Sequence, residues 1–274
     1  MIDTHAHIHD ALFDKDRREV IVRAQKAGIT KMITIGTSVR ESREALLLAK
    51  EYADILYATA AVHPCEYSKL PSLELQQQWM REVEIMAQEK EVKGIGECGL
   101  DYHTFENIEI SAEQKQSQRK GFLQHIRLAE KVKKPLIIHA RDSYEDVFEM
   151  VSLYGKNIPH ILLHCYQGDR EITKKYIQSS LPIFFSFSGS ITYPVKKSIE
   201  KTKDDPREVM REIPLEKILL ETDCPYLSPQ SQRGKRNEPM FIFETVTFLA
   251  EQKKISLGKL EDILEYNFSS LFGK

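Results

Sequence analysis

The first ten residues, MIDTHAHIHD, carry histidines at alternate positions, His5, His7 and His9. In a β-strand, residues two apart point to the same face, so His5 and His7 are expected to project together from one strand. Two imidazoles placed in this way form a bidentate ligand for a divalent metal ion. His9 has the same parity but lies beyond the expected end of the strand, so we interpret it as a non-ligand.

Further histidines and carboxylates follow other short apolar runs of the chain. If those runs are parallel strands of one sheet, these side chains meet at its carboxyl edge. Four imidazoles and two carboxylates are too many donors for one tetrahedral ion but suit two divalent ions that share Glu97. The predicted division gives one ion His5, His7, Glu97 and Asp223, and the other Glu97, His139 and His164 with a position open for water.

Eight β-rich runs alternate with helical patterns along the whole chain. The predicted strands span residues 1–8, 31–36, 55–63, 92–97, 135–140, 160–165, 182–188 and 217–223. Apolar residues at three- and four-residue steps predict helices over 15–27, 39–52, 72–90, 111–133, 142–154 and 169–179, and two closing helices within 240–271. This alternation predicts an α/β fold, a (β/α)8 TIM barrel whose site lies at the carboxyl ends of the strands. An open doubly wound sheet is the alternative.

Composition is that of a water-soluble globular protein. The chain has 274 residues, 41% hydrophobic and 29% charged, and we expect one domain over residues 1–274. No apolar run approaches the roughly 20 residues of a membrane span, and the first residues show no signal-type stretch, so we expect a cytoplasmic protein. Lys and Arg number 39 against 41 Asp and Glu, which leaves only local basic patches for nucleic-acid contact. The four cysteines form no CxxC pair and are expected to be reduced.

The ordered motifs resemble the signature segments of the TatD family of metal-dependent hydrolases. These motifs are MIDTHAHIH, AVHP, IGECGLDYH, LIIHARD, LLHCYQG and LLETDCPYLSP…RGKRNEP, and the resemblance covers nearly the whole chain. The family belongs to the amidohydrolase superfamily, has a TIM-barrel fold and is associated with deoxyribonuclease activity. Each motif alone is weak, but the ordered set of six is specific.

The resemblance implies the same metal ligands as the strand-parity argument. Carried over position by position, it selects His5, His7, Glu97, His139, His164 and Asp223. Many amidohydrolases bridge their two metals with a carbamylated lysine. Here Glu97 stands at that strand end and Lys93 lies at the strand's start, so Glu97 is the expected bridge. Imidazole and carboxylate donors accept Zn²⁺, Mn²⁺, Co²⁺ or Mg²⁺.

Several residues near these motifs are candidate substrate contacts. His63 in AVHP either contacts a substrate phosphate or orders its loop, and Arg141 shares the direction of His139. Arg233, Lys235 and Arg236 follow the last predicted strand, where this fold often binds phosphate. Tyr102, Tyr166 and Tyr226 either stack on bases or pack in the core. We interpret the basic helix near 115–134, His125 and the cysteines after the ligands as structural.

The leading prediction is hydrolysis of DNA phosphodiester bonds, in which two cations lower the pKa of the attacking water. Asp223 accepts or relays the proton, with Glu97 as the second catalytic carboxylate. An alternative keeps the centre but cleaves another ester or amide, such as the aminoacyl bond of a mischarged tRNA. A third possibility is a non-catalytic metal-binding scaffold, against which the complete ligand set argues. Nucleic acid is the expected partner, no membrane is expected, and the sequence is compatible with a monomer.

Overall fold

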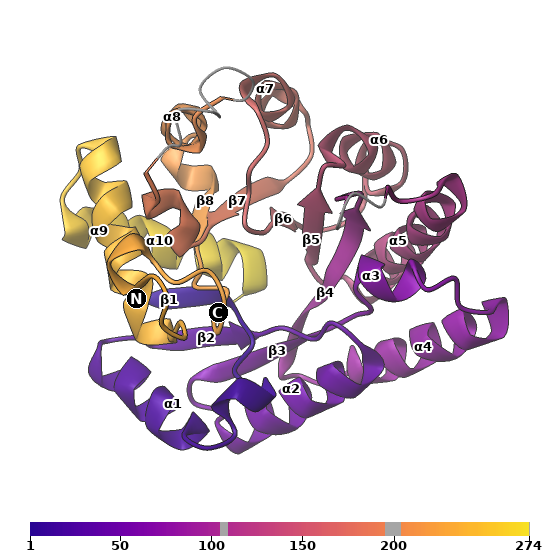
Figure 1. The fold of residues 1–274 in the computed structure, drawn as a ribbon, viewed down its shortest axis with the longest axis horizontal. Coiled ribbons are helices and arrows are strands. Elements are labelled where there is room, and N and C mark those ends of the chain that lie inside the picture. The colour runs from indigo at the N-terminus through magenta and orange to yellow at the C-terminus, as the bar shows by residue number, and fades with distance from the viewer. Residues whose placement is uncertain (105–108, 195–203, 274) are drawn as a thin grey trace. The chain divides into compact units, whose positions relative to one another are not determined.

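All eight predicted strands are present in the computed structural model, which describes residues 1–104, 109–194 and 204–273. The strands are β1 (Ile2–Ala6), β2 (Lys31–Thr34), β3 (Leu56–Ala60), β4 (Val92–Asp101), β5 (Leu136–Arg141), β6 (Ile161–Leu163), β7 (Ile183–Phe187) and β8 (Ile218–Leu220) (Figure 1). Their order in the sheet follows the chain from β1 to β8. This is the strand order of a (β/α)8 barrel, whereas the order of a doubly wound sheet reverses at a switch point.

The predicted helices are also present, with ends that differ by a few residues. They are α1 (Arg17–Lys26), α2 (Val39–Glu51), α4 (Leu73–Met86), α5 (Ala112–Val132), α6 (Tyr144–Tyr154), α7 (Arg170–Gln178), α9 (Ile242–Lys253) and α10 (Leu257–Phe272). Two short helices were not predicted, α3 (Pro64–Tyr67) and α8 (Pro206–Glu212). Both are too short to show helical periodicity. None of the helices in the described part of the chain is long and apolar enough to span a membrane.

Short 3-10 helices complete the connections. They are η1 (Ala11–Phe13), η2 (Gly189–Thr192), η3 (Leu215–Lys217), η4 (Gln230–Gln232) and η5 (Pro239–Phe241). The chain divides into two compact units. Unit 1 comprises Met1–Thr34, Cys165–Ser179 and Phe184–Lys274, and unit 2 comprises Ile35–His164 and Ser180–Ile183. That residues 1–274 act as one domain stays a prediction.

Unit 1 contains both ends of the described chain. In it β1 pairs with β2 and β7 with β8, all in parallel, and α10 packs against β1 and β8 while α9 lies on α10 (Figure 1). Although β1 is completely buried, it carries polar side chains. Thr4 donates a hydrogen bond to the carbonyl oxygen of Leu220 at 3.0 Å, which satisfies its hydroxyl inside the core.

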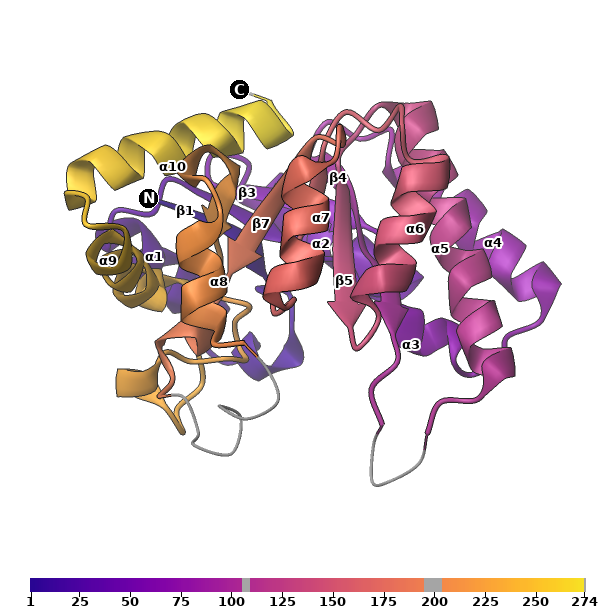
Figure 2. The same ribbon diagram turned by 90° about the horizontal axis from the view of Figure 1, so that it is seen from above.

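Unit 2 contains the strands β3 to β6, in which β3 pairs with β4, β4 with β5 and β5 with β6, all in parallel. Helix α2 packs on β3, α5 on β4 and α6 on β5, and α4 lies against α2 and α5. Figure 2 shows α6, α5 and α4 following one another beside these strands. The strands are rich in buried apolar residues such as Ile95, Leu136 and Ile161, as expected where helices cover a parallel sheet.

His125 is a structural residue of unit 2, as the sequence predicts. It is fully buried on α5, where Nδ1–H donates to the carbonyl oxygen of Gly121 at 2.8 Å. Nε2 accepts a hydrogen bond from the backbone N–H of Val62 at 3.1 Å. Burial lowers the pKa of His125 to about 4, because the charged ring is poorly solvated there. The neutral ring therefore anchors the segment that leads into His63.

This pKa predicts a loss of stability in mild acid. The unfolded chain takes up a proton on His125 near its ordinary pKa of 6.5, whereas the folded chain does so near 4. The contribution of His125 to the free energy of unfolding is thus complete above pH 6.5 and falls as the pH drops toward 4, by about 3 kcal/mol. Urea unfolding of the wild type and His125→Gln at several pH values between 4 and 8 measures it. We expect the stability difference between the two proteins to shrink on acidification, and a constant difference would contradict this interpretation.

Candidate metal centre

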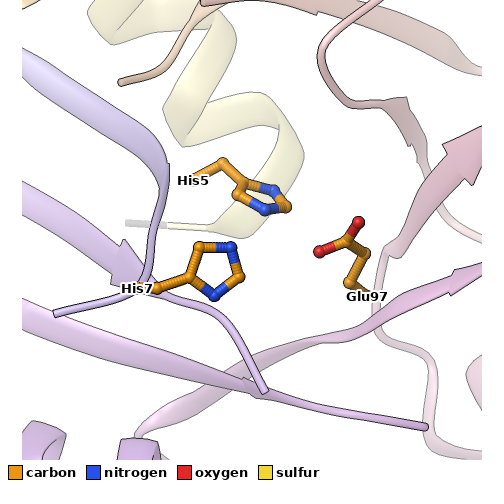
Figure 3. Close-up of side chains that lie close together, drawn as sticks. All are labelled: His5, His7 and Glu97. Atoms are coloured by element: carbon orange, nitrogen blue, oxygen red, sulfur yellow. The ribbon is translucent and has the colours of Figure 1, made fainter. Parts of the chain in front are cut away.

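Unit 1 brings together His5, His7 and Asp223. The imidazoles of His5 and His7 lie beside each other with ring centroids 5.3 Å apart (Figure 3). Asp223 Oδ1 lies 3.6 Å from His5 Nε2 and 3.3 Å from His7 Nε2. Two imidazoles and one carboxylate thus face a common point, as metal ligands do.

Backbone hydrogen bonds hold these three residues in place. The N–H of Asp223 donates to the carbonyl oxygen of His5 at 2.8 Å, and the N–H of His7 donates to that of Cys224 at 2.7 Å. The first residues after β8 therefore run alongside the end of β1 and the residue that follows it. Asp223 has a left-handed backbone with φ of 55°, a conformation that Asp tolerates better than most residues and that turns the chain at this point.

Asp3 joins the same two segments inside the core. Its carboxylate accepts a hydrogen bond from the Thr222 N–H at 2.9 Å, a second from the Thr222 hydroxyl, and a third from the His5 N–H at 3.3 Å. Burial raises the pKa of Asp3 to about 7, although these hydrogen bonds lower it. Asp3 thereby fixes the position of His5 relative to the segment that carries Asp223.

Unit 2 surrounds Glu97 with three imidazoles. The Glu97 side chain projects from β4 (Figure 3) and is only 4% exposed. Its Oε1 lies 2.9 Å from His139 Nδ1, 2.9 Å from His164 Nε2 and 3.4 Å from His63 Nε2. His139 Nδ1 and His164 Nε2 are 3.4 Å apart. The structure therefore places His139 and His164 beside the carboxylate with which they are predicted to hold one ion, and it adds His63.

Glycines let β4 approach β5 closely enough for these contacts. A Cβ atom on Gly96 would lie 2.5 Å from the Cβ of Ile137. At Gly99, where φ is 137°, it would lie 2.1 Å from the carbonyl oxygen of His139. Glycine is therefore required on both sides of Glu97.

Sequence reasoning missed Asp101. The prediction ended this strand at Glu97, but β4 continues to Asp101, where it pairs with Arg141 on β5. Asp101 Oδ2 lies 3.1 Å from His139 Nε2, the ring nitrogen opposite the one that faces Glu97. Because Asp101 has the same strand parity as Glu97, alternation over a longer strand would have found it.

The pKa values of His139 and Asp101 are shifted in opposite directions. Burial, the largest influence, lowers the pKa of His139, but its hydrogen bonds with Asp101 and Glu97 outweigh burial and raise it. Burial, again the largest influence, raises the pKa of Asp101, but the hydrogen bond and charge of His139, the His103 N–H and the charge of His63 together lower it. In the metal-free chain, the two side chains therefore stabilise each other's charged forms.

The contacts of His63 define its hydrogen-bonding role. His63 is the N-cap of α3, where its Nδ1 accepts a hydrogen bond from the Cys65 N–H at 3.2 Å. A neutral imidazole that accepts at Nδ1 carries its proton on Nε2. Nε2 of His63 is then a donor that points toward Glu97, not a lone pair for a metal ion.

The predicted substrate contacts are placed differently from one another. Arg141 is exposed at the end of β5, and Lys235 donates to the side chain of Gln232 at 3.1 Å. The Arg233 guanidinium lies over the ring of Tyr193, 4.5 Å from its centroid. Arg236 is engaged elsewhere, with two hydrogen bonds of 2.7 Å to Asp16 and one of 3.0 Å to Glu238.

The remaining residues near the motifs have varied environments. Cys98 and Cys224 are buried packing residues, as predicted, and burial raises the pKa of both thiols well above the ordinary value. Cys165 is only half-buried, with Sγ 3.4 Å from the hydroxyl of Ser188. Tyr166 packs in the core, whereas Tyr226 is 50% exposed, with its ring 5.9 Å from that of His7. His9 contacts the hydroxyl of Thr34 at 3.0 Å.

The donor atoms fit divalent metal ions. In unit 2, Glu97 Oε1 lies 2.9 Å from a ring nitrogen of His139 and 2.9 Å from one of His164, and unit 1 offers His5, His7 and Asp223. Imidazole nitrogen and carboxylate oxygen are ligands that zinc, manganese and cobalt accept. A buried carboxylate facing several imidazoles is also stabilised by a bound cation.

An α/β barrel with histidine and carboxylate donors near the ends of its strands defines a class of metal-dependent hydrolases. Comparison with known families shows which family of this class the chain belongs to. A family model described as TatD related DNase matches residues 2–273, so the chain belongs to the TatD family of metal-dependent hydrolases. The resemblance noted in the sequence is thereby confirmed.

Two curated relatives cover nearly the whole chain. One, at 33% identity over 99% of this chain and 98% of its own length, is the uncharacterized metal-dependent hydrolase YabD of Bacillus subtilis. Another, the 3'-5' ssDNA/RNA exonuclease TatD of Pantoea ananatis, is 31% identical over 100% of this chain and 99% of its own length.

A solved structure confirms the fold. The crystal structure of YJJV, a TatD homolog from Escherichia coli K12, is similar with a TM-score of 0.85 at 23% identity, covering 100% of this chain and 98% of that one. The predicted TIM-barrel fold is therefore correct.

Neutralising Glu97 is expected to weaken metal binding. Glu97→Gln keeps the size of the side chain but removes the charge that faces the imidazoles. We expect fewer Zn²⁺ or Mn²⁺ ions per chain by elemental analysis, and a smaller rise in melting temperature on adding the metal. Glu251→Gln, at an exposed glutamate of α9, is the matched control. Equal metal content in the two variants would show that Glu97 holds no ion.

Proposed function

We propose that this protein is a nuclease that hydrolyses phosphodiester bonds of DNA with two divalent metal ions. The observation that carries the proposal is the surrounding of the buried Glu97 carboxylate by His139 and His164, both 2.9 Å away. A carboxylate has two oxygens, so Glu97 can bind one cation beside these imidazoles and a second cation as well.

The proposed ligands are the six residues selected in the sequence. One ion would be held by His5, His7, Glu97 and Asp223, and the other by Glu97, His139 and His164. The barrel fold supports this division, because the carboxyl ends of its strands converge. Zn²⁺, Mn²⁺, Co²⁺ and Mg²⁺ are all compatible with these donors. Bound cations would lower the pKa of water and draw negative charge away from a phosphodiester.

Side chains of this protein carry out the remaining steps. Asp223 accepts the proton of the attacking water, for which a carboxylate next to His5 and His7 is suited. His63 directs its Nε2–H toward Glu97 and helps to hold that carboxylate in place, since its Nδ1 is occupied by the Cys65 N–H. The exposed Arg141 offers a guanidinium on the same strand as His139.

Relatives favour nucleic acid over other esters. The curated TatD of Pantoea ananatis, 31% identical, is named a 3'-5' ssDNA/RNA exonuclease. Metal ligands alone do not encode the bond that is cleaved, because activated water attacks carbon as well as phosphorus. The choice of a nucleic-acid substrate therefore rests on this likeness and on the cationic Arg141, which lies on the same strand as His139.

Activity is expected to depend on the metal ions and on both carboxylates. Chelation should abolish cleavage of a 5'-labelled single-stranded DNA, and one or more of the four cations added back singly should restore it. Glu97→Gln and Asp223→Asn should each lower kcat/KM by about 10²–10⁴-fold, while Glu251→Gln should not.

The same assay separates the rival reactions. Single-stranded RNA, mischarged aminoacyl-tRNA and a phosphate triester are tested in parallel with DNA. Faster deacylation of tRNA than cleavage of DNA would replace the proposed substrate. Unchanged DNA cleavage by both carboxylate variants would assign the activity to a contaminant.

The basic residues after β8 are expected to differ in effect. Arg233→Ala and Lys235→Ala should weaken binding of single-stranded DNA and make its dependence on salt shallower, by about 0.7 in the logarithmic slope for each lost phosphate contact. Arg236→Ala should instead lower the melting temperature, because it breaks the pairing with Asp16 and Glu238. Binding titrations at several salt concentrations, together with thermal unfolding, measure both effects. A reduced salt dependence in Arg236→Ala at unchanged stability would reverse this assignment.

A further inference from the structure

We propose that Asp101 is a positioning residue that selects the tautomer of His139, so that the Nδ1 lone pair of His139 faces Glu97 and the metal ion. This inference rests on the proposed metal centre and adds to it a residue outside the ligand set. Asp101 acts through the imidazole, on the side of the ring away from Glu97.

The two ring nitrogens of His139 have different partners. Nε2 lies 3.1 Å from Asp101 Oδ2, and Nδ1 lies 2.9 Å from Glu97 Oε1. An ionised carboxylate only accepts hydrogen bonds, so Asp101 requires the proton on Nε2. A neutral imidazole then has its lone pair at Nδ1, where a metal ion beside Glu97 needs it.

Asp101 is itself held rigidly. Its other carboxylate oxygen, Oδ1, accepts a hydrogen bond from the His103 N–H at 3.0 Å. The buried side chain of Gln118 on α5 makes two hydrogen bonds with the backbone of Asp101. It accepts one from the Asp101 N–H and donates one to the Asp101 carbonyl oxygen, both at 2.8 Å. Gln118 also donates to the Ser68 hydroxyl at 2.7 Å. Asp101 therefore has little freedom to turn away from His139.

His63 shows what the absence of such a carboxylate does. Its second nitrogen, Nδ1, meets a donor, the Cys65 N–H at 3.2 Å, which forces the proton onto Nε2 beside Glu97. His63 and His139 are neighbours, with ring centroids 4.5 Å apart, yet their second contacts select opposite roles. The partner on the far nitrogen decides whether a ring near Glu97 binds a metal ion or donates a hydrogen bond.

The tautomer can be read directly by NMR. Long-range ¹H–¹⁵N spectra of protein labelled with ¹⁵N-histidine distinguish a protonated from an unprotonated ring nitrogen, and His139→Gln identifies the signals. At pH 8 we expect His139 of the Zn²⁺-loaded chain to carry its proton on Nε2 only. Asp101→Ala should populate the Nδ1–H form of His139 in the metal-free chain. Asp101→Asn should do the same when the NH2 group of the asparagine faces Nε2 of the ring.

Metal affinity gives a second readout. Asp101→Ala should raise the Kd for Zn²⁺ by roughly 10- to 100-fold, measured by competition with a chelating dye. In the Co²⁺-loaded protein it should also change the visible absorption bands of the metal. Asp146→Asn is the matched control, because Asp146 pairs with Tyr102 and Arg119 and not with a proposed ligand. Melting temperatures of the metal-free variants show that each is folded, and Asp101→Glu replaces Asp101→Ala if the latter is not.

The outcomes separate this inference from the proposed function. A Zn²⁺-loaded wild-type chain with the His139 proton on Nδ1 would overturn the inference, as would Asp101 variants that match Asp146→Asn in both tautomer and Kd. If the protein binds metal but cleaves no DNA, the proposed function fails while the effects of Asp101 on tautomer and affinity still stand. If it binds no metal, the proposed centre fails and takes the inference about metal affinity with it.

Discussion

The burial of the Glu97 carboxylate is the constraint on which the proposed site depends. A carboxylate that is only 4% exposed loses most of its hydration, and this loss must be offset by positive charge or by hydrogen-bond donors. Three imidazoles lie within 3.4 Å of it, and they supply that compensation either by carrying protons or by sharing a cation with it. A metal ion would stabilise both the carboxylate and the imidazoles, because its charge attracts the carboxylate and it also takes up the imidazole lone pairs. The electrostatics of unit 2 and the chemistry proposed for it therefore have one cause.

The backbone around each group is specialised to allow this burial. Gly99 brings β4 so near β5 that a Cβ there would collide with His139, and Asp3 ties β1 to the segment before Asp223 inside the core. His125 stays neutral in order to hold Val62, which leads into His63. Gly99, Asp3 and His125 are buried, and none of these three is a proposed ligand. Their effect is to fix directions, since metal ligation tolerates little error in the placement of donor atoms.

Periodicity predicted much of the architecture because the barrel repeats one simple unit. Alternation of apolar strands and amphipathic helices located all eight strands, and the parity of residues along strands selected the ligand candidates. Asp101 escaped because β4 continues past Glu97, and the end of a strand is fixed by pairing with its neighbour, not by its own sequence. Helix α3 is too short for a periodic signal. The pairing of Arg236 with Asp16 joins residues far apart in the chain, so a basic loop that reads as phosphate-binding is partly neutralised in a way that local sequence does not reveal.

Distance alone does not identify a metal ligand in such a cluster. His63 and His139 both place a ring nitrogen near the same oxygen of Glu97, and by proximity both qualify. Their far nitrogens differ, however, because one accepts from a backbone N–H and the other faces a carboxylate. If the ring nitrogen away from Glu97 accepts a hydrogen bond, the nitrogen that faces Glu97 must carry the proton. Otherwise the ring would be an anion, which is costly next to a carboxylate. The second contacts of His63 and His139 therefore separate a hydrogen-bond donor from a proposed metal ligand.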